Sequence, residues 1–156
     1  MKGLTNAAFY SLIEASTENI LNMWSLRLDK PVKFDVFFTC KPEDQFAKHI
    51  PEEIKNVYYM NIKEFGVYAM FSYESIEKYE ALEWSEILFK AFLANISSLF
   101  ENKNAVLDKL FIKESFQGIF DSILPEIISS GKDFQGIGFM AQGLTGFLII
   151  PAPKEL

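Results

Sequence analysis

Cysteine and histidine are almost missing from this sequence. Its 156 residues include one of each, Cys40 and His49. A disulfide within one chain needs two cysteines, and the usual zinc site takes its ligands from several Cys and His side chains. The sequence therefore excludes a disulfide framework and a Cys/His zinc site within one chain. We expect a reducing compartment and a fold that needs neither metal nor disulfide.

Long uncharged apolar runs and an excess of basic residues are also lacking. Glu14 and Glu18 fall where a signal sequence needs an unbroken apolar stretch, and no window long enough to span a membrane is free of strong polarity. The net charge is −6 and the acidic residues are spread along the chain, which opposes binding to nucleic acid or to an anionic membrane. We expect a cytoplasmic protein that binds neither nucleic acid nor membrane.

Apolar side chains are abundant instead. They make up 49% of the residues and aromatic side chains 15%, with 16 Phe, so burial can offset the entropy lost on folding. No repeat, low-complexity tract or linker divides the chain. The length suits one domain with a proper core, and we predict a single domain spanning 1–156.

Hydrophobic periodicity predicts the order of the elements. Apolar residues at three- and four-residue spacing predict helices, and alternation predicts strands. In chain order we expect a helix at 5–26, a strand at 32–41, a hairpin at 57–72 turning near Gly66, helices at 72–82, 84–100 and 115–130, and a second hairpin at 133–150 turning at Gln142 and Gly143. Residues 102–114 fit both helix and extended chain. The order α-β-β-β-α-α-α-β-β predicts an α+β fold, with an antiparallel or mixed sheet of about five strands covered by helices.

The segment from Trp84 to Phe100 is the most apolar of the predicted helices, and we expect it to be central to the core. Asn95 is the exception within it. Because asparagine is unfavourable inside helices and costs free energy when buried without a partner, something should satisfy its amide. Asn95 is either a buried amide bonded to backbone groups, which we favour, or a functional amide at the rim of a groove.

Gly136, Gly138 and Ala141 satisfy the G-x-G-x-x-A form of the dinucleotide-binding fingerprint. That chemistry requires a helix N-terminus directly after the glycines, within a βαβ unit. Here the following residues favour a strand, so we interpret the glycines as positions where a strand passes close to a neighbouring helix.

Other chemically active side chains have simpler interpretations. His49 lies in a charged segment without a nucleophile or metal-ligand partner at useful spacing, so we expect an exposed histidine. Alternation places Cys40 on the buried face of the first strand, where it acts as a small hydrophobic residue rather than a reactive thiol. The aromatic side chains of the first hairpin could line a ligand pocket, although core packing is the more usual role: Tyr58, Tyr59, Tyr68 and Phe71.

A polar stripe follows the first helix. Ser11, Glu14, Glu18, Asn22 and Ser25 recur at three- and four-residue spacing. Glu18 and Asn22 are four positions apart (E-x-x-x-N), about one turn, and a carboxylate and an amide at this spacing can together hold a water for attack on a phosphoryl group brought by a partner. A solvated helix face is the more usual interpretation of such a stripe.

The order of these segments resembles the chemotaxis phosphatases CheC and CheX and the related flagellar switch domains. The resemblance covers nearly the whole chain: a first helix NAAFYSLIEASTENILNMW, then strands, GVYAMFSYESIEKYEAL as strand and helix, a long helix containing ANISS, and a terminal hairpin. In that family, an acidic residue and an asparagine in E-x-x-N act on the aspartyl phosphate of a response regulator. The Mg²⁺ of the reaction belongs to the regulator.

The family motif maps onto this sequence with departures. On the central helix Asn95 is kept, but Phe92 stands at the glutamate position. The first helix has Glu18 and Asn22, but one residue further apart than in E-x-x-N. Glu14 precedes them where the family has Asp or Ser, and Pro42 follows at a shorter distance than in the family. The resemblance therefore implies that Glu18 orients the water and Asn22 helps it displace the phosphate. It also implies a homodimer that needs no cofactor of its own and binds a response regulator.

Two other function classes stay open. An acidic adaptor or secretion-chaperone-like dimer could hold another protein through its strands or apolar helix faces without catalysis. A small-molecule module would use the aromatic hairpin instead.

Overall fold

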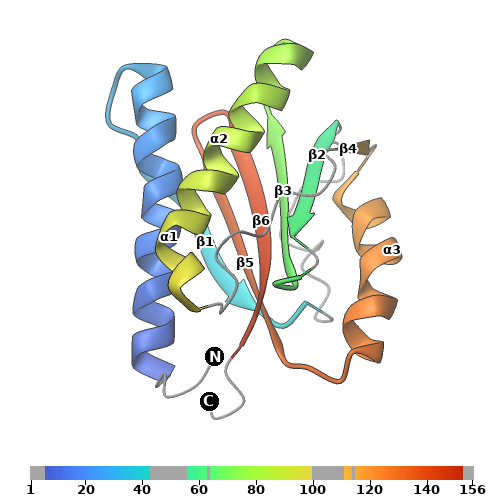
Figure 1. Cartoon of the computed structure of the whole chain (residues 1–156). Helices are drawn as coiled ribbons and strands as arrows, with labels where there is room; N and C mark the ends of the chain where they lie inside the picture. Colours follow the sequence, from blue (N-terminus) through green and yellow to red (C-terminus); the bar gives the residue numbers. More distant parts are fainter. Residues whose placement is uncertain (1–5, 43–55, 63, 100–110, 114, 153–156) are drawn as a thin grey trace.

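The computed structural model describes residues 6–42, 56–62, 64–99, 111–113 and 115–152. It shows an α+β fold in which one antiparallel sheet has helices on both faces (Figure 1). The predicted fold class is therefore confirmed.

The sheet has the strand order β1-β5-β6-β3-β2-β4, and every pair of neighbours is antiparallel. Its strands, as far as the structure is described, are β1 (Phe34–Cys40), β2 (Val57–Ile62), β3 (Val67–Tyr73), β4 (Phe111–Lys113), β5 (Phe134–Ala141) and β6 (Leu144–Pro151). The two hairpins, β2–β3 and β5–β6, form the middle of the sheet, and β3 pairs with β6 to join them. Strand β1 lies at one edge, next to β5.

Helices α1 (Asn6–Leu28) and α2 (Lys78–Ile96) cover one face of the sheet, and a short 3₁₀ turn, Ser97–Leu99, follows α2. Helix α3 (Phe116–Ser129) covers the opposite face (Figure 1). Each layer has its own hydrophobic cluster. Phe9, Phe89 and Phe139 belong to the larger cluster under α1 and α2, whereas Phe120 and Phe147 belong to the smaller one under α3.

Two details of the predicted order differ. Residues 72–82 and 84–100 are not separate helices, because Ser72 ends up in β3 and a single helix, α2, starts after Glu77. The Glu77 carboxylate accepts a hydrogen bond from the Tyr79 N–H at 3.1 Å and thus caps this helix. The second difference is β4, which pairs with β2 in the segment where the sequence did not decide between helix and strand.

Strand β1 does not keep its apolar residues on one face as the alternation predicted. A bulge between Phe34 and Val36 shifts the register, so that Phe34 packs on the α1/α2 side. The extra residue in the bulge shifts the alternation of side chains by one position. Phe38 and Cys40 therefore pack on the α3 side, not on the same side as Phe34. Val36 and Phe37 are 39% and 37% exposed.

Both predicted hairpins are confirmed, as is the helix predicted at 115–130, which is α3. Gly66 and Gly143 adopt positive φ angles of 70° and 73° at the two turns, a conformation that glycine takes without strain. Ser115 caps α3 by accepting a hydrogen bond from the Gly118 N–H at 3.1 Å. The helix continues through Pro125, where we expected a kink or a restart, and ends before Gly131. No helix in the described residues has the length and apolar character needed to cross a membrane.

Candidate functional site

Helix α1 is held firmly against its neighbours, so its outer face is a rigid platform. The Trp24 Nε1–H donates to the Gln142 carbonyl in the β5–β6 turn at 2.7 Å. Asn19 Nδ2 donates to the Ala91 carbonyl of α2 at 3.2 Å, and Arg27 pairs with Glu80 of α2 at 2.6 Å. These polar links fix the rotation of α1 about its own axis.

The predicted polar stripe is exposed along most of α1. Ser11, Glu14, Glu18 and Asn22 all face solvent. Ser25 does not belong to it, because its hydroxyl donates to the Leu21 carbonyl and accepts from the Val32 N–H. The candidate site therefore ends at Asn22.

Glu18 and Asn22 lie one helical turn apart, close enough for both side chains to contact one small molecule. Within the described residues, neither side chain forms a hydrogen bond or an ion pair. Ala15, which is also exposed, precedes Glu18 by one turn and adds little bulk beside it. The carboxylate and the amide are thus accessible and free to bind an incoming group.

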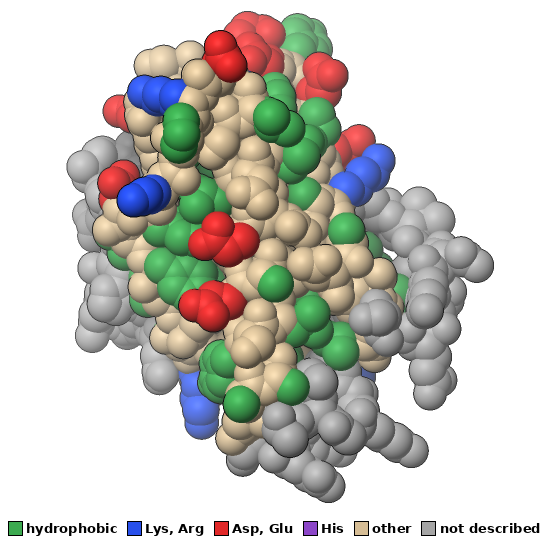
Figure 2. Space-filling model, turned by 90° about the vertical axis from the view of Figure 1, so that its left-hand side faces the viewer, with side chains coloured by type: hydrophobic (Ala, Val, Ile, Leu, Met, Phe, Trp, Pro, Cys, Tyr) green, Lys and Arg blue, Asp and Glu red, His purple; other side chains and the backbone are tan. Residues whose placement is uncertain are grey.

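The surroundings of this stripe are partly apolar. Figure 2 looks at the molecule from the α1 side and shows hydrophobic side chains gathered beside acidic ones.

Near the start of α1, the Tyr10 hydroxyl donates to Gln135 Oε1 at 3.1 Å, and Gln135 Nε2 donates to the Cys40 carbonyl of β1 at 2.9 Å. Residues 10 and 135 are so far apart in the chain that the sequence gave no signal of this link.

Glu18 and Asn22 turn progressively away from the β1 edge. Each four-residue step along a helix rotates the side chain by about 40°. Tyr10 points toward β5 and β1, so Asn22, three such steps later, points about 120° away from it around the axis. The site therefore faces outward from the helix rather than toward the sheet edge.

The corresponding position on α2 is blocked. Phe92, at the glutamate position of the family motif, is fully buried in the cluster under α1 and α2. Asn95 is half-buried, and its side chain makes no hydrogen bond within the described residues, so the backbone-bonded amide that we favoured is not observed. A carboxylate in place of Phe92 would be buried without water, so α2 cannot present an exposed carboxylate one turn before Asn95.

The glycines of the fingerprint serve packing. Gly136 and Gly138 lie inside β5, and a Cβ atom at Gly136 would come 2.6 Å from Phe147 Cζ. A Cβ atom at Gly138 would overlap the ring of Phe38. No helix follows β5, which runs through a two-residue turn into β6, so a pyrophosphate site is ruled out here. The close neighbours are rings from adjacent strands, not the helix that we expected.

The aromatic side chains of the β2–β3 hairpin belong to the core. Phe71 lies under α1 and α2, whereas Tyr59 and Tyr68 lie under α3, so they cannot line one pocket.

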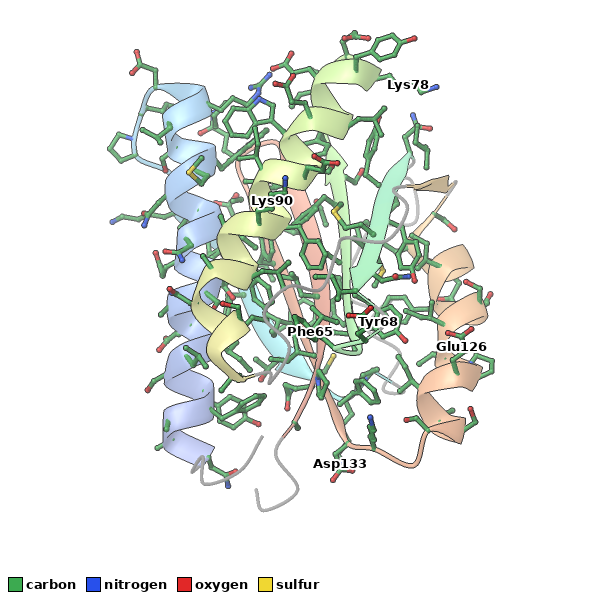
Figure 3. All side chains as sticks on the ribbon, viewed as in Figure 1. Phe65, Tyr68, Lys78, Lys90, Glu126 and Asp133 are labelled. Carbon is green, nitrogen blue, oxygen red and sulfur yellow. The ribbon has the colours of Figure 1, made fainter. Side chains whose placement is uncertain are left out.

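Burial raises the pKa of the Tyr68 hydroxyl, and the negative charge of Glu126 raises it further. Figure 3 shows Tyr68 on the sheet and Glu126 on the facing helix α3. Asn61, also buried, donates to the Tyr59 hydroxyl at 2.7 Å, but its Oδ1 has no partner within the described residues.

Cys40 is half-buried in β1 and contacts the cluster under α3, as expected for a small hydrophobic residue. His49 lies outside the described residues. In the described part of the chain, no group of three or more His, Cys, Asp or Glu side chains is arranged to hold a metal ion.

No model of a known protein family matches the chain, and no curated protein matches it.

Proposed function

We propose that this protein binds a phosphorylated response regulator through the outer face of α1 and hydrolyses its aspartyl phosphate. The observation that carries the proposal is the pair Glu18 and Asn22, exposed one turn apart on a firmly anchored helix and without partners in the described structure. An enzyme that acts on a group buried in another protein needs side chains that project outward, and both residues do so.

The proposed chemistry is an in-line displacement at phosphorus. The Glu18 carboxylate accepts a hydrogen bond from a water and so orients a lone pair of the water oxygen toward the phosphorus. The Asn22 amide holds the same water and a phosphoryl oxygen. The bond from the water oxygen to phosphorus forms as the bond from phosphorus to the aspartyl oxygen breaks. The products are inorganic phosphate and the free aspartate of the regulator.

The proposal assigns the Mg²⁺ to the regulator, whose phosphoryl group it neutralises. Helix α1 supplies neutral and anionic oxygens for positioning a water, and the net charge of −6 gives the chain no general affinity for phosphate. Recognition must therefore come from surface complementarity, to which the apolar side chains beside the stripe contribute (Figure 2).

The test measures the lifetime of the phosphoryl group on response regulators from the same organism, with Mg²⁺ present and with or without this protein. We expect the wild-type protein to shorten the lifetime. Glu18→Gln and Asn22→Ala each should lose about 100-fold or more of this activity, because each removes one group that positions the water. Glu83→Gln on the exposed side of α2 is the matched control and should act like wild type.

Unchanged lifetimes with every regulator would show that the catalytic proposal is wrong. If the protein then still bound phosphorylated regulator, the fold would serve binding only. If it bound no regulator at all, the whole assignment would fail and the non-catalytic adaptor would be the better hypothesis.

A further inference from the structure

Two partly exposed aromatic side chains lie on the flank of α1 that faces β1. Phe37 of β1 is 37% exposed, and Tyr10 of α1 is 39% exposed. Phe37 pairs with Phe139, which belongs to the cluster under α1 and α2, so the Phe37 side chain lies on the same face of the sheet as α1. Val36, which is 39% exposed, points to the opposite face. These two neighbours therefore expose similar fractions of apolar side chains on different sides of the molecule.

Two hydrogen bonds align helix α1 with strand β5. The Tyr10 hydroxyl donates to Gln135 near the start of β5, and the Trp24 Nε1–H donates to the Gln142 carbonyl in the turn after this strand. The helix rises about 21 Å from Tyr10 to Trp24, and the strand rises about 23 Å from Gln135 to Gln142. The two elements therefore run side by side in the same direction at a nearly equal rise.

This alignment places Phe37 at the level of Glu18. Phe139 lies just past the middle of 135–142, as Glu18 lies just past the middle of 10–24, and Phe37 is opposite Phe139 in the sheet. Figure 2 shows hydrophobic side chains directly beside acidic ones on this side of the molecule. A standard interface buries about 800 Å² on each partner, the area of a disc with a radius of about 16 Å. A protein centred on Glu18 therefore covers Phe37 as well.

Phe37 is held in place and has an acidic neighbour. Its ring contacts the Phe34 ring at a centroid distance of 5.2 Å, and Phe34 contacts Phe139 of the core at 5.5 Å. Glu14 follows Tyr10 by one turn, about 40° further around α1, so its exposed carboxylate lies on the same flank. Glu14 forms no ion pair in the described part of the chain. A ring that is already ordered loses little entropy on binding, and an unpaired carboxylate favours a partner with a cation.

We propose that Phe37 and Glu14 select the response regulator. An apolar side chain of the regulator packs on the Phe37 ring, and a lysine or arginine beside it pairs with Glu14. Both residues set the affinity, and neither touches the reacting phosphoryl group. The inference rests on the proposed function and adds the chemistry of the partner's surface, a basic side chain next to an exposed apolar one.

Leu26, one turn after Asn22, is another exposed apolar side chain near the proposed catalytic pair, at 72% exposure. Aromatic side chains are enriched in interfaces, whereas leucine is under-represented among the residues that dominate binding. Phe37 rather than Leu26 is therefore the anchor.

The test measures the dephosphorylation rate over a range of concentrations of the regulator whose phosphoryl lifetime the wild-type protein shortens. Phe37→Thr removes the ring but keeps a residue that favours strands. It should raise the half-saturating regulator concentration at least about tenfold and leave the maximal rate within about twofold, because it removes binding alone. Val36→Thr on the opposite face and Leu26→Gln on α1 are the controls, and both should act like wild type.

Glu14→Gln tests the cation. It should raise the half-saturating concentration about threefold and make this concentration less dependent on salt, because one ion pair with the regulator is lost. A change that only loosened the structure would leave the salt dependence as it is in wild type. An unchanged salt dependence would therefore overturn the role of Glu14.

Hydroxyl-radical footprinting of the wild-type protein gives a second test of Phe37 that needs no variant to fold. A regulator activated by beryllofluoride, which mimics the aspartyl phosphate, should protect Phe37 from oxidation and leave Val36 as reactive as in the free protein. If the wild type binds a regulator without shortening its phosphoryl lifetime, catalysis fails and footprinting still decides on Phe37.

The inference alone is overturned if the wild type is active but Phe37→Thr acts like it, or if Phe37 stays unprotected in the complex. It is equally overturned if Val36→Thr or Leu26→Gln raises the half-saturating concentration as much as Phe37→Thr does. A wild-type protein that neither shortens a lifetime nor binds a regulator overturns the proposed function and this inference together.

Discussion

Tyr73 shows how a polar group is accommodated inside the layer between the sheet and α2. Its hydroxyl lies 2.8 Å from the Ser85 hydroxyl, which donates to the Ala81 carbonyl of the same helix. Its ring contacts Trp24 and Tyr58 at centroid distances of 5.5 and 5.7 Å. Burial therefore raises the pKa of the Tyr73 hydroxyl well above its ordinary value, although the bond to Ser85 offsets part of the rise.

This raised pKa predicts a loss of stability in alkali. Unfolded Tyr73 ionises near pH 10, whereas the folded protein keeps the proton to higher pH, so stability is fully present below pH 10 and falls as the pH rises above it. The slope from this one group is at most about 1.4 kcal/mol per pH unit. Urea unfolding at pH 8 to 11 should show a flatter decline for Tyr73→Phe than for wild type.

The exposed Tyr79 provides the control for that experiment, since its side chain is 75% exposed. Tyr79→Phe should leave the alkaline decline as steep as in wild type. An equally steep decline in Tyr73→Phe would show that the burial of Tyr73 does not set the pH dependence.

Among the elements, the β5–β6 hairpin depends on glycines opposite phenylalanines. Gly146 lies opposite Phe139, whose ring covers its bare backbone, and the ring of Phe147, which lies opposite Gly138, covers Gly136 instead. The ring of Phe38 from β1 lies across Gly138. This arrangement lets three strands carry large rings without a clash.

We predict that Gly138→Ala destabilises the protein by about 1–3 kcal/mol, because the new methyl group must displace the Phe38 ring. Gly118→Ala is the matched substitution in α3, where the added Cβ atom meets only Ser115 Oγ at 3.4 Å. It should stabilise the protein by about 0.5 kcal/mol, since alanine is the better helix former. Denaturant midpoints measure both changes, and equal effects would contradict the role of the ring.

The same elements show what the sequence could reveal. Local signals were sufficient for α1, both hairpins and the cap and end of α3, because apolar spacing, Gly66, Gly143, Ser115 and Gly131 act within a few residues. The continuous α2 was missed because polar residues in its first turns resembled a separate surface helix. The bulge in β1 was missed because strand register depends on the partner strand, which comes about a hundred residues later.

For the candidate site, the sequence located the exposed pair Glu18 and Asn22 on α1 but could not tell that Ser25 turns inward or that Phe92 fills the core. Both facts depend on how α1 and α2 pack on the sheet. Glu18 and Asn22 could be identified because an exposed i, i+4 pair on one helix is a local feature.

For the whole molecule, the sheet separates two hydrophobic clusters of unequal size. The larger one joins α1 and α2 to the sheet, and several of its side chains are fully buried, among them Trp24, Phe89 and Phe139. The smaller one is formed by a single helix, α3, and the far side of the sheet. Because local stability follows the apolar surface that an element buries, the two layers should not open together.

We therefore predict that α3 opens by partial unfolding while α1, α2 and the central strands stay folded. In native-state hydrogen exchange, the amides of Phe120 and Ile123 should show a free energy of opening several kcal/mol below that of Phe139 and Leu148 in β5 and β6. Phe120→Ala should lower the opening free energy of α3 further and change that of α1 little, since α3 reaches α1 only through the sheet. Equal opening free energies in both layers would show instead that the molecule unfolds as a single cooperative unit.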